Sequence, residues 1–341
     1  MKIHTLKIKI SNKWIGDDSP VFILAEAGIN HNGSIKIAKK MITEAKKSGA
    51  DGIKFQTFKA DDLAIPTSKF FKIFKKLELS DSNFEELSDY AKSNDIIFCS
   101  TPSSLGAVDL LSKLHVPTIK IASGDLTNIP LIKYAASKKK PMIISTGMAN
   151  MTEVKNAIGA IESTGNKKSI ILHCVSAYPT PPNEVNLNVI HELKKQFHYP
   201  IGFSDNGPGI EVPLTSIAVG AKILEKHFTL NRKMKGPDQL LSADPTQLKQ
   251  IVTKTREIEE LLGDGKKRCQ PSELENKINA RRSITAARTI ERGTKITKDM
   301  IVTKRPSLGI EPVYWSKVIG KKTAKKIRIH KSIKWSDLLD K

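Results

Sequence analysis

Two lysines occupy the ends of short apolar runs, Lys54 in GIKFQT and Lys120 in TIKIAS. A lysine in such a place can form a Schiff base with a carbonyl compound, or it can hold a phosphate or carboxylate as a point charge. Other apolar runs end in hydroxyl side chains, which donate hydrogen bonds to anions. These hydroxyls belong to Thr101, Ser123, Ser145 and Ser204. Lysines that snorkel from a loop are the structural alternative, but the hydroxyls favour an anion site over a dry Schiff-base pocket.

Two further groups could move protons or bind a metal. In AEAGINHNG, Glu26 is placed to act as a general base, although Asn30 and the glycines would also suit a loop that caps a helix starting near Ser34. The segment KHFTLNRKMKGPD contributes His227 and Asp238. A histidine at a strand end is a metal ligand, a proton donor or a hydrogen-bonded wall residue, and no HExxH motif or histidine pair decides between these roles.

These groups need a scaffold, and the chain supplies a repeated alternation of apolar runs with amphipathic helical stretches. The runs cover residues 21–26, 52–57, 96–101, 118–123, 141–146, 169–174, 200–205 and 222–227. Predicted helices between and after them include 34–49, 83–94, 151–165 and 244–263. Runs that are apolar on both faces and separated by helices are typical of parallel strands in βαβ units. Eight units in about 240 residues predict an α/β fold, the (β/α)8 TIM barrel. A doubly wound sheet is disfavoured because EAGINHNG is not a GxGxxG turn.

A barrel gathers functional groups at the carboxyl ends of its strands. The polar residues there are Glu26, Lys54, Gln56, Thr101, Lys120, Ser123, Ser145, His173, Tyr178, Ser204, Asp205, Glu225 and His227. We therefore predict that the eight strand ends share one site for an anionic substrate.

The chain of 341 residues is predicted to contain two domains. Residues 1–262 form the barrel, with 1–18 as an N-terminal cap that includes a hairpin near 3–15. Residues 263–280 form a polar linker, and 281–341 a small domain of short strands.

Composition narrows the class of protein. No apolar run is long enough for a signal peptide or a membrane span, and the three cysteines are too far apart for a CxxC zinc site, so we expect a cytoplasmic enzyme. The net charge of +21 suggests nucleic acid or an anionic surface. The lysines are nevertheless scattered over predicted helix faces and no RNA-binding motif is present, so we predict neither a nucleic-acid nor a membrane partner.

Several motifs, taken together and in order, resemble the sialic acid synthase family. They are AEAGINHNGS, GIKFQTFKA, STP, KIASGDLTNIPLI, ISTGMA, LHCVSAYPTP, GFSD, EKHFTL and GPD, and the tail ARRSITAARTIERGTKITKDMIVTKRPSLGI resembles an antifreeze-like (SAF) domain. The resemblance covers residues 20–340 and implies a TIM barrel followed by this small β-rich domain. The family joins phosphoenolpyruvate to an N-acylated mannosamine-type sugar, adds water at C2 and breaks the C–O bond to phosphate, which yields a nine-carbon 2-keto acid.

The resemblance also implies roles for individual residues. Catalysis would involve Glu26, Lys54 and Lys120. Phosphoenolpyruvate would be bound by Thr101, Ser123, Ser145, Ser176 and Ser204. The sugar would meet Gln56, Tyr178, Asp238 and, across a domain-swapped homodimer, Arg305. A divalent cation, Mn²⁺ or Mg²⁺, would polarise the sugar aldehyde as a Lewis acid, with His227 and Asn206 as ligands.

Three positions depart from the family pattern. Asn206 stands where many members have the second histidine ligand, Asp125 stands where a glutamate is common, and Ser176 stands where some members have asparagine. An amide oxygen suits a hard ion. The sugar could be N-acetylmannosamine or a 2,4-diacetamido-2,4,6-trideoxyhexose, which would give legionaminic or pseudaminic acid. A Schiff-base aldolase and a nucleic-acid-binding protein are the alternatives from other classes.

Overall fold

Eight parallel strands close into a barrel in the computed structural model, which describes residues 5–339. Each strand pairs with the next along the chain, and the last pairs with the first. The strands are β3 (Phe22–Gly28), β4 (Gly52–Thr57), β5 (Ile97–Pro102), β6 (Ile119–Ile121), β7 (Met142–Ser145), β8 (Ser169–Cys174), β9 (Ile201–Asp205) and β10 (Ile223–His227). The predicted TIM barrel is confirmed, and each strand coincides with one of the eight apolar runs.

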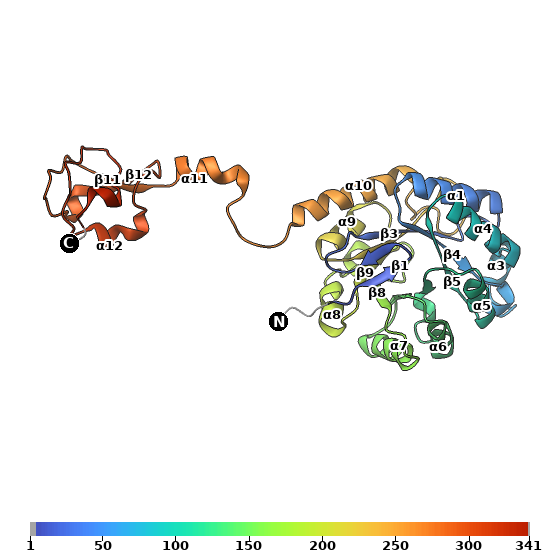
Figure 1. Cartoon of the computed structure of the whole chain (residues 1–341). Coiled ribbons are helices and arrows are strands. Elements are labelled where there is room, and N and C mark those ends of the chain that lie inside the picture. The colour runs from blue at the N-terminus through green and yellow to red at the C-terminus, as the bar shows by residue number, and fades with distance from the viewer. Residues whose placement is uncertain (1–4, 340–341) are drawn as a thin grey trace. The chain divides into compact units, whose positions relative to one another are not determined.

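Helices surround these strands (Figure 1). They are α1 (Ile35–Lys47), α4 (Asp81–Ser93), α5 (Leu105–Lys113), α6 (Ile129–Ser137), α7 (Met151–Ser163), α8 (Val189–Gln196), α9 (Glu211–Ala218) and α10 (Pro245–Leu262), with the short α2 (Ala60–Leu63) and α3 (Phe71–Leu77) between β4 and α4. Ser34, Asn150 and Asp244 each cap a helix, because their side chains accept a hydrogen bond from the backbone of the first turn.

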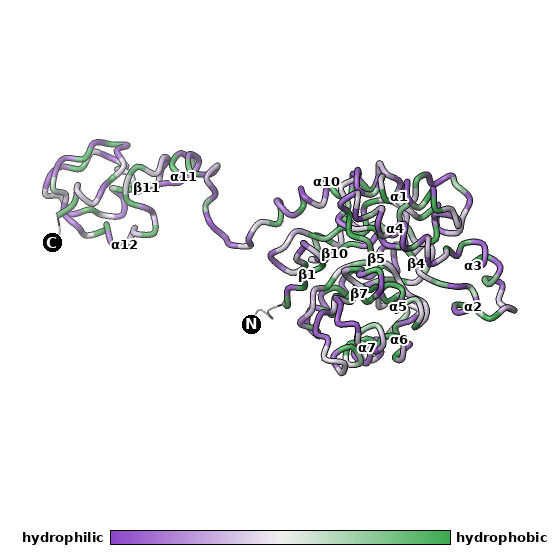
Figure 2. Tube along the Cα trace, turned by 45° about the vertical axis from the view of Figure 1, so that its right-hand side comes forward, coloured by the Kyte–Doolittle hydropathy of each residue, from purple (hydrophilic) through white to green (hydrophobic). Residues whose placement is uncertain are grey.

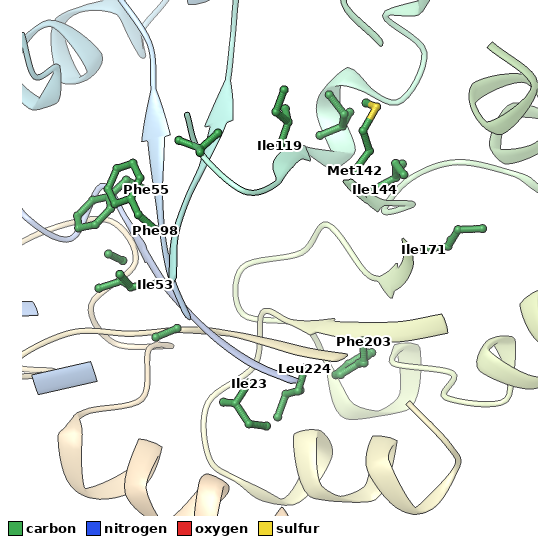
Figure 3. Packing of buried hydrophobic residues seen from close by; sticks show 14 of the residues in the cluster. Ile23, Ile53, Phe55, Phe98, Ile119, Met142, Ile144, Ile171, Phe203 and Leu224 are labelled. Atoms are coloured by element: carbon green, nitrogen blue, oxygen red, sulfur yellow. The ribbon is translucent and has the colours of Figure 1, made fainter. Parts of the chain in front are cut away.

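One hydrophobic cluster fills the space between the barrel and its helices. Figure 3 shows part of it, including Ile23, Ile53, Phe55 and Leu224, which project from neighbouring strands. The helices cover the outer face of the barrel, which is why the strands are apolar on this face too.

A second, smaller cluster fills the barrel interior near the amino ends of the strands. Phe22, Leu24 and Ile223 belong to it, together with isoleucines of a hairpin formed by β1 (Ile8–Ile10) and β2 (Lys13–Ile15). The hairpin predicted near residues 3–15 is therefore present, although residues 1–4 lie outside the described part of the chain. Because apolar residues fill the amino end of the barrel, only the carboxyl end is left for polar groups.

The chain divides into two compact units after Gly263. In the second unit, β11 (Ser283–Ala286) and β12 (Ile301–Lys304) pair antiparallel, and isolated bridges such as Ile290–Ile327 complete its turn-rich structure. Its core consists mainly of isoleucines. Residues 340–341, the end of the predicted small domain, lie outside the described range.

The predicted linker 263–280 contains short helical elements, η3 (Pro271–Glu273) and α11 (Leu274–Ala280). The connection from α10 to α11 is coloured hydrophilic in Figure 2. No helix among residues 5–339 is long and apolar enough to cross a membrane.

Candidate active site

A polar cavity of about 230 Å³ opens at the carboxyl ends of the barrel strands. Twelve of the predicted site residues line it: Glu26, Lys54, Gln56, Thr101, Lys120, Ser123, Ser145, Tyr178, Ser204, Asn206, His227 and Asp238. Barrel closure thus brings together residues that the chain spaces over more than 200 positions. Ser176 and Arg305 are the two predicted residues that are not among those lining it.

Two lysines and two glutamates form the charged centre of the cavity. Lys54 Nζ lies 2.7 Å from Glu26 Oε2 and 3.9 Å from Glu225 Oε2. On the opposite side, Lys120 Nζ lies 3.7 Å from Glu225 Oε1. All four side chains are buried, and the two positive charges are balanced by two carboxylates.

Burial sets the protonation equilibria of these groups. It raises the pKa of Glu26 to about 7, although the Lys54 ammonium acts in the opposite direction. Burial also raises the pKa of Glu225 on its own, but Lys120 and Lys54 outweigh this effect and hold the pKa below its ordinary value. Glu26 is therefore the carboxyl group that can gain and lose a proton near neutral pH.

The pKa values of the two lysines are also shifted in opposite directions. Burial lowers the pKa of Lys120. For Lys54 burial has the same direction, yet Glu225 and Glu26 together reverse it and raise the pKa. Lys54 consequently keeps its positive charge, which favours anion binding there over Schiff-base formation.

Hydroxyl groups line the cavity beside the two lysines and form the predicted anion-binding wall. Lys120 Nζ donates to Ser145 Oγ at 2.6 Å, and Lys54 Nζ donates to Thr101 Oγ1 at 3.2 Å. Ser204 Oγ donates to Glu225 Oε1 at 2.8 Å. Ser123 also lines the cavity, where its hydroxyl lies 3.6 Å from the Cys174 sulfur. The hydroxyls come from four different strand ends, as the sequence predicted.

Ser176 does not line the cavity and lies close to Gly147. A Cβ added at Gly147 would come within 2.5 Å of Ser176 Oγ and 2.3 Å of Ser123 Cβ, and Gly147 has a φ of +38°. Only glycine fits this approach without strain. The Ser176 hydroxyl is buried and has no hydrogen-bond partner among the described residues.

Three of the four predicted sugar contacts line the cavity: Gln56, Tyr178 and Asp238. Gln56 Nε2 donates to Glu26 Oε1 at 3.2 Å. Burial raises the pKa of Asp238. Tyr178 is 56% exposed, and its ring packs edge-on against His227 with centroids 5.9 Å apart. Arg305 belongs to the second unit, where it follows β12 and is exposed.

His227 and Asn206 offer the donor atoms of the predicted metal site. Burial lowers the pKa of His227 to about 3, so the imidazole is neutral and able to act as a ligand. Its Nδ1 is buried without a partner among the described residues. Asn206 Nδ2 donates to the Val175 carbonyl at 2.7 Å, which leaves the amide oxygen as the atom available to a cation.

This donor set fits a hard divalent cation. Oxygen ligands suit Mg²⁺ and Mn²⁺, and imidazole is tolerated by Mn²⁺. Among residues 5–339, no three or more His, Cys, Asp or Glu side chains form a group that could hold a metal ion by itself. Protein donors would therefore be few, and substrate or water oxygens would supply the rest of the coordination sphere.

Seven of the residues that line the cavity had no role in the predicted site: Phe58, Leu63, Ser103, Ala122, Asp125, Cys174 and Glu225. Two strand-end residues lie outside the cavity. Glu225 and Cys174 line the cavity, whereas Asp205 and His173 do not. His173 Nε2 instead bonds the Val185 carbonyl at 2.7 Å. Successive strand side chains point to opposite faces, so His227 inside the cavity implies that Glu225 faces inward as well. Glu225 was already expected among the strand-end residues that share the site, and this alternation is the signal that could have given it a role there.

The sequence of this chain is similar to known proteins and to two protein-family profiles. A NeuB family profile matches residues 41–267, and a SAF domain profile matches residues 281–339. An uncharacterized protein of Methanocaldococcus jannaschii is 46% identical, with 98% of this chain and 99% of that protein covered. The N,N'-diacetyllegionaminic acid synthase of Legionella pneumophila is 39% identical, with 95% and 96% covered.

Solved structures agree with these sequence matches. The N-acetylneuraminic acid synthetase of Leptospira borgpetersenii, crystallised with citrate, aligns with a TM-score of 0.77 at 37% identity. The alignment covers 80% of this chain and 96% of that one. Both the barrel and the small domain thus have counterparts in proteins of related sequence.

Proposed function

Because this chain belongs to the NeuB family, we propose that it condenses phosphoenolpyruvate with an N-acylated aminosugar to form a nonulosonic (sialic-type) acid and phosphate. The observation that carries the proposal is the charged centre, in which two buried lysines and hydroxyls from four strands face one cavity. Phosphoenolpyruvate carries a phosphate and a carboxylate, and these groups require such donors.

In the proposed reaction, C3 of phosphoenolpyruvate forms a bond to the aldehyde carbon of the open-chain sugar. Water then adds to C2, and the C2–O bond to phosphate breaks, so that phosphate leaves and C2 becomes a ketone. Lys54 and Lys120 would hold the carboxylate and phosphate groups. Ser145 and Thr101, which are hydrogen-bonded to these lysines, would fix their positions.

Glu26 is the proposed general base. Its carboxylate would accept the proton that the attacking water loses, and Lys54 and Gln56 hold it in place. A base with a pKa near the working pH combines a large unprotonated fraction with a strong affinity for the proton. Burial gives Glu26 such a pKa.

A divalent cation would be held by His227 and Asn206, with Mn²⁺ and Mg²⁺ as the candidates. When bound, it would polarise the sugar aldehyde as a Lewis acid. The protein's contribution is to keep the imidazole neutral and to present the amide oxygen toward the cavity.

Tyr178, Gln56 and Asp238 are the proposed sugar contacts within the barrel unit. Arg305 would add a contact from the second unit of a partner chain in a domain-swapped homodimer. The acceptor is N-acetylmannosamine or a related N-acylated hexose in the first proposal. A 2,4-diacetamido-2,4,6-trideoxyhexose is the second candidate, supported by identities of 39% and 40% to two legionaminic acid synthases against 33% to a pseudaminic acid synthase.

Phosphate release from phosphoenolpyruvate, measured with a panel of these sugars with and without EDTA, tests the proposal. Phosphoenolpyruvate labelled with ¹⁸O in the bridging position should yield labelled phosphate, because the C–O bond breaks. Phosphate release with none of the sugars, or unlabelled phosphate, would contradict the proposed reaction. Trapping by borohydride in the presence of pyruvate would instead indicate a Schiff base, for which Lys120 is the candidate.

A cytoplasmic location and the lack of a nucleic-acid partner remain predictions. Residues 281–339 carry 16 lysines and arginines against 4 acidic residues, so the second unit is where nucleic-acid binding should be tested. A salt-dependent gel shift at nanomolar protein concentration would contradict the prediction.

A further inference from the structure

A buried ion pair joins the ends of β9 and β10 next to the proposed metal ligands. Lys226 and Asp205 face each other across the parallel ladder, and Lys226 Nζ lies 2.5 Å from Asp205 Oδ2. The two side chains are 0% and 2% exposed. Neither residue lines the cavity, so neither is placed to contact the substrate. Asn206 and His227 are the residues that directly follow them in the chain.

The pair bonds the backbone on the far side of Asn206 as well. Lys226 Nζ donates to the Gly207 carbonyl, and Asp205 Oδ1 accepts from the Gly207 amide at 3.1 Å. Through these bonds the ion pair fixes the chain on both sides of Asn206, at Asp205 and at Gly207. The Asn206 carbonyl itself accepts a hydrogen bond from the Thr180 amide at 3.2 Å.

The position of the turn formed by residues 205–207 determines the orientation of the Asn206 side chain. Asn206 Nδ2 donates to the Val175 carbonyl at 2.7 Å and to the Cys174 sulfur at 3.4 Å, both at the end of β8. A shift of the turn away from β8 would break these bonds and allow the amide to rotate. The amide nitrogen, which cannot bind a cation, could then replace the oxygen at the cavity surface.

A contribution to folding stability does not by itself explain why a buried ion pair is present here. The desolvation of two buried charges offsets most of their attraction, and apolar replacements are often at least as stable. The location gives a better reason, because the pair connects the two strand ends that carry the two ligands. We propose that Lys226 and Asp205 are positioning residues, which fix the turn 205–207 so that the Asn206 amide oxygen and the His227 imidazole converge on one divalent cation.

The inference rests on the metal site of the proposed function, and a binding experiment without turnover tests it. Mn²⁺ is titrated into metal-free protein, and free Mn²⁺ is measured by electron paramagnetic resonance. We expect Lys226→Met to weaken Mn²⁺ binding about 10- to 100-fold, the effect that loss of an outer-shell partner typically has. Asp205→Asn keeps the acceptor for the Gly207 amide and should act in the same direction, which provides a second variant if Lys226→Met does not fold.

A double-mutant cycle separates positioning from general damage. If Lys226 acts through Asn206, then Asn206→Ala should weaken Mn²⁺ binding less in the Lys226→Met background than in the wild type. Leu248→Ala, which removes a fully buried side chain of α10, is the control for lost stability and should leave Mn²⁺ affinity unchanged.

Each other outcome counts against the inference. Wild-type Mn²⁺ affinity in both single variants, effects of Asn206→Ala and Lys226→Met that simply multiply, or an equal loss in Leu248→Ala would overturn it. A wild-type protein that releases phosphate without binding Mn²⁺ would overturn the inference but not the synthase reaction. Coupled Mn²⁺ binding without phosphate release would support the inference and contradict the reaction.

Discussion

Substitution of Glu26 by glutamine tests the proposed base directly. Glutamine keeps the size of the side chain and its hydrogen bond with Gln56, but it cannot accept a proton. It also removes the 2.7 Å ion pair with Lys54. Any loss of turnover can therefore be assigned to the proton acceptor or to the position of Lys54, and the magnitude and pH dependence distinguish the two.

General-base catalysis typically contributes about 10²- to 10⁴-fold, so we expect turnover to fall by this factor, or by about 3–5 kcal/mol in activation free energy. Removing one member of a buried pair costs about 3–5 kcal/mol of stability when the remaining charge is left alone. Lys54 retains Glu225 at 3.9 Å and Thr101 at 3.2 Å. The loss of stability should therefore lie at or below the lower end of that range, and the barrel should remain folded.

The assay is phosphate release as a function of substrate concentration, at saturating Mn²⁺, between pH 5.5 and 8.5. In the wild type, kcat/KM should decline below a pKa of about 7, because the carboxylate is the active form of the base. In Glu26→Gln this acidic limb should disappear. Glu259→Gln, which alters a carboxylate bonded to Arg256 and to the Val21 amide just before β3, is the matched control. Near-wild-type turnover in Glu26→Gln, or an equal loss in Glu259→Gln, would refute the assignment.

Three further substitutions test the scaffold and the anion wall. Ile10→Ala, in the hairpin that closes the barrel interior, should reduce the free energy of unfolding in guanidinium chloride by about 2–5 kcal/mol; a cost within experimental error would show that the hairpin is dispensable. Burial lowers the pKa of His31 to about 4. The free energy of unfolding should therefore be highest above pH 6.5 and should fall by about 3 kcal/mol as the pH is lowered toward 4, because the unfolded chain binds the proton more tightly. His31→Gln should remove this pH dependence of unfolding, and an unchanged slope would contradict it. Gly147→Ala forces a Cβ against Ser123 and Ser176 and should raise KM for phosphoenolpyruvate about tenfold. Gly159→Ala, which has open space within 4 Å, should leave KM unchanged, and equal values in the two variants would argue against a close-packed anion wall.

The barrel was predictable from the sequence because each element is encoded locally. Runs such as VFILAE and KILEKH are apolar on both faces, and only strands buried between an interior and a layer of helices need that composition. Capping residues such as Ser34 and Asp244 fixed the helix starts in the same local way. The short α2 and α3 were not predicted, although Phe70, Ile73, Phe74 and Leu77 at the second of them follow the i, i+3, i+4, i+7 spacing of a helix.

The candidate site was predictable in composition but not in contacts. Lys54, Lys120 and Glu26 were identified because polar residues end apolar runs, and closure of the barrel then brings such ends together. The sequence could not show that Glu225 lies between the two lysines, since that contact joins β10 to β4 and β6 across the barrel axis.

The segment Glu225–Lys226–His227 shows the difference between what the sequence determines and what the tertiary structure determines. By itself the sequence determined that three ionisable groups end the last strand of a barrel, because that follows from residue type and order. Only the tertiary structure decided that Glu225 and His227 enter the cavity while Lys226 turns away to Asp205. The physical reason is that side chains alternate between the faces of a strand, whereas the face that becomes the interior is set by closure of the sheet around a common axis.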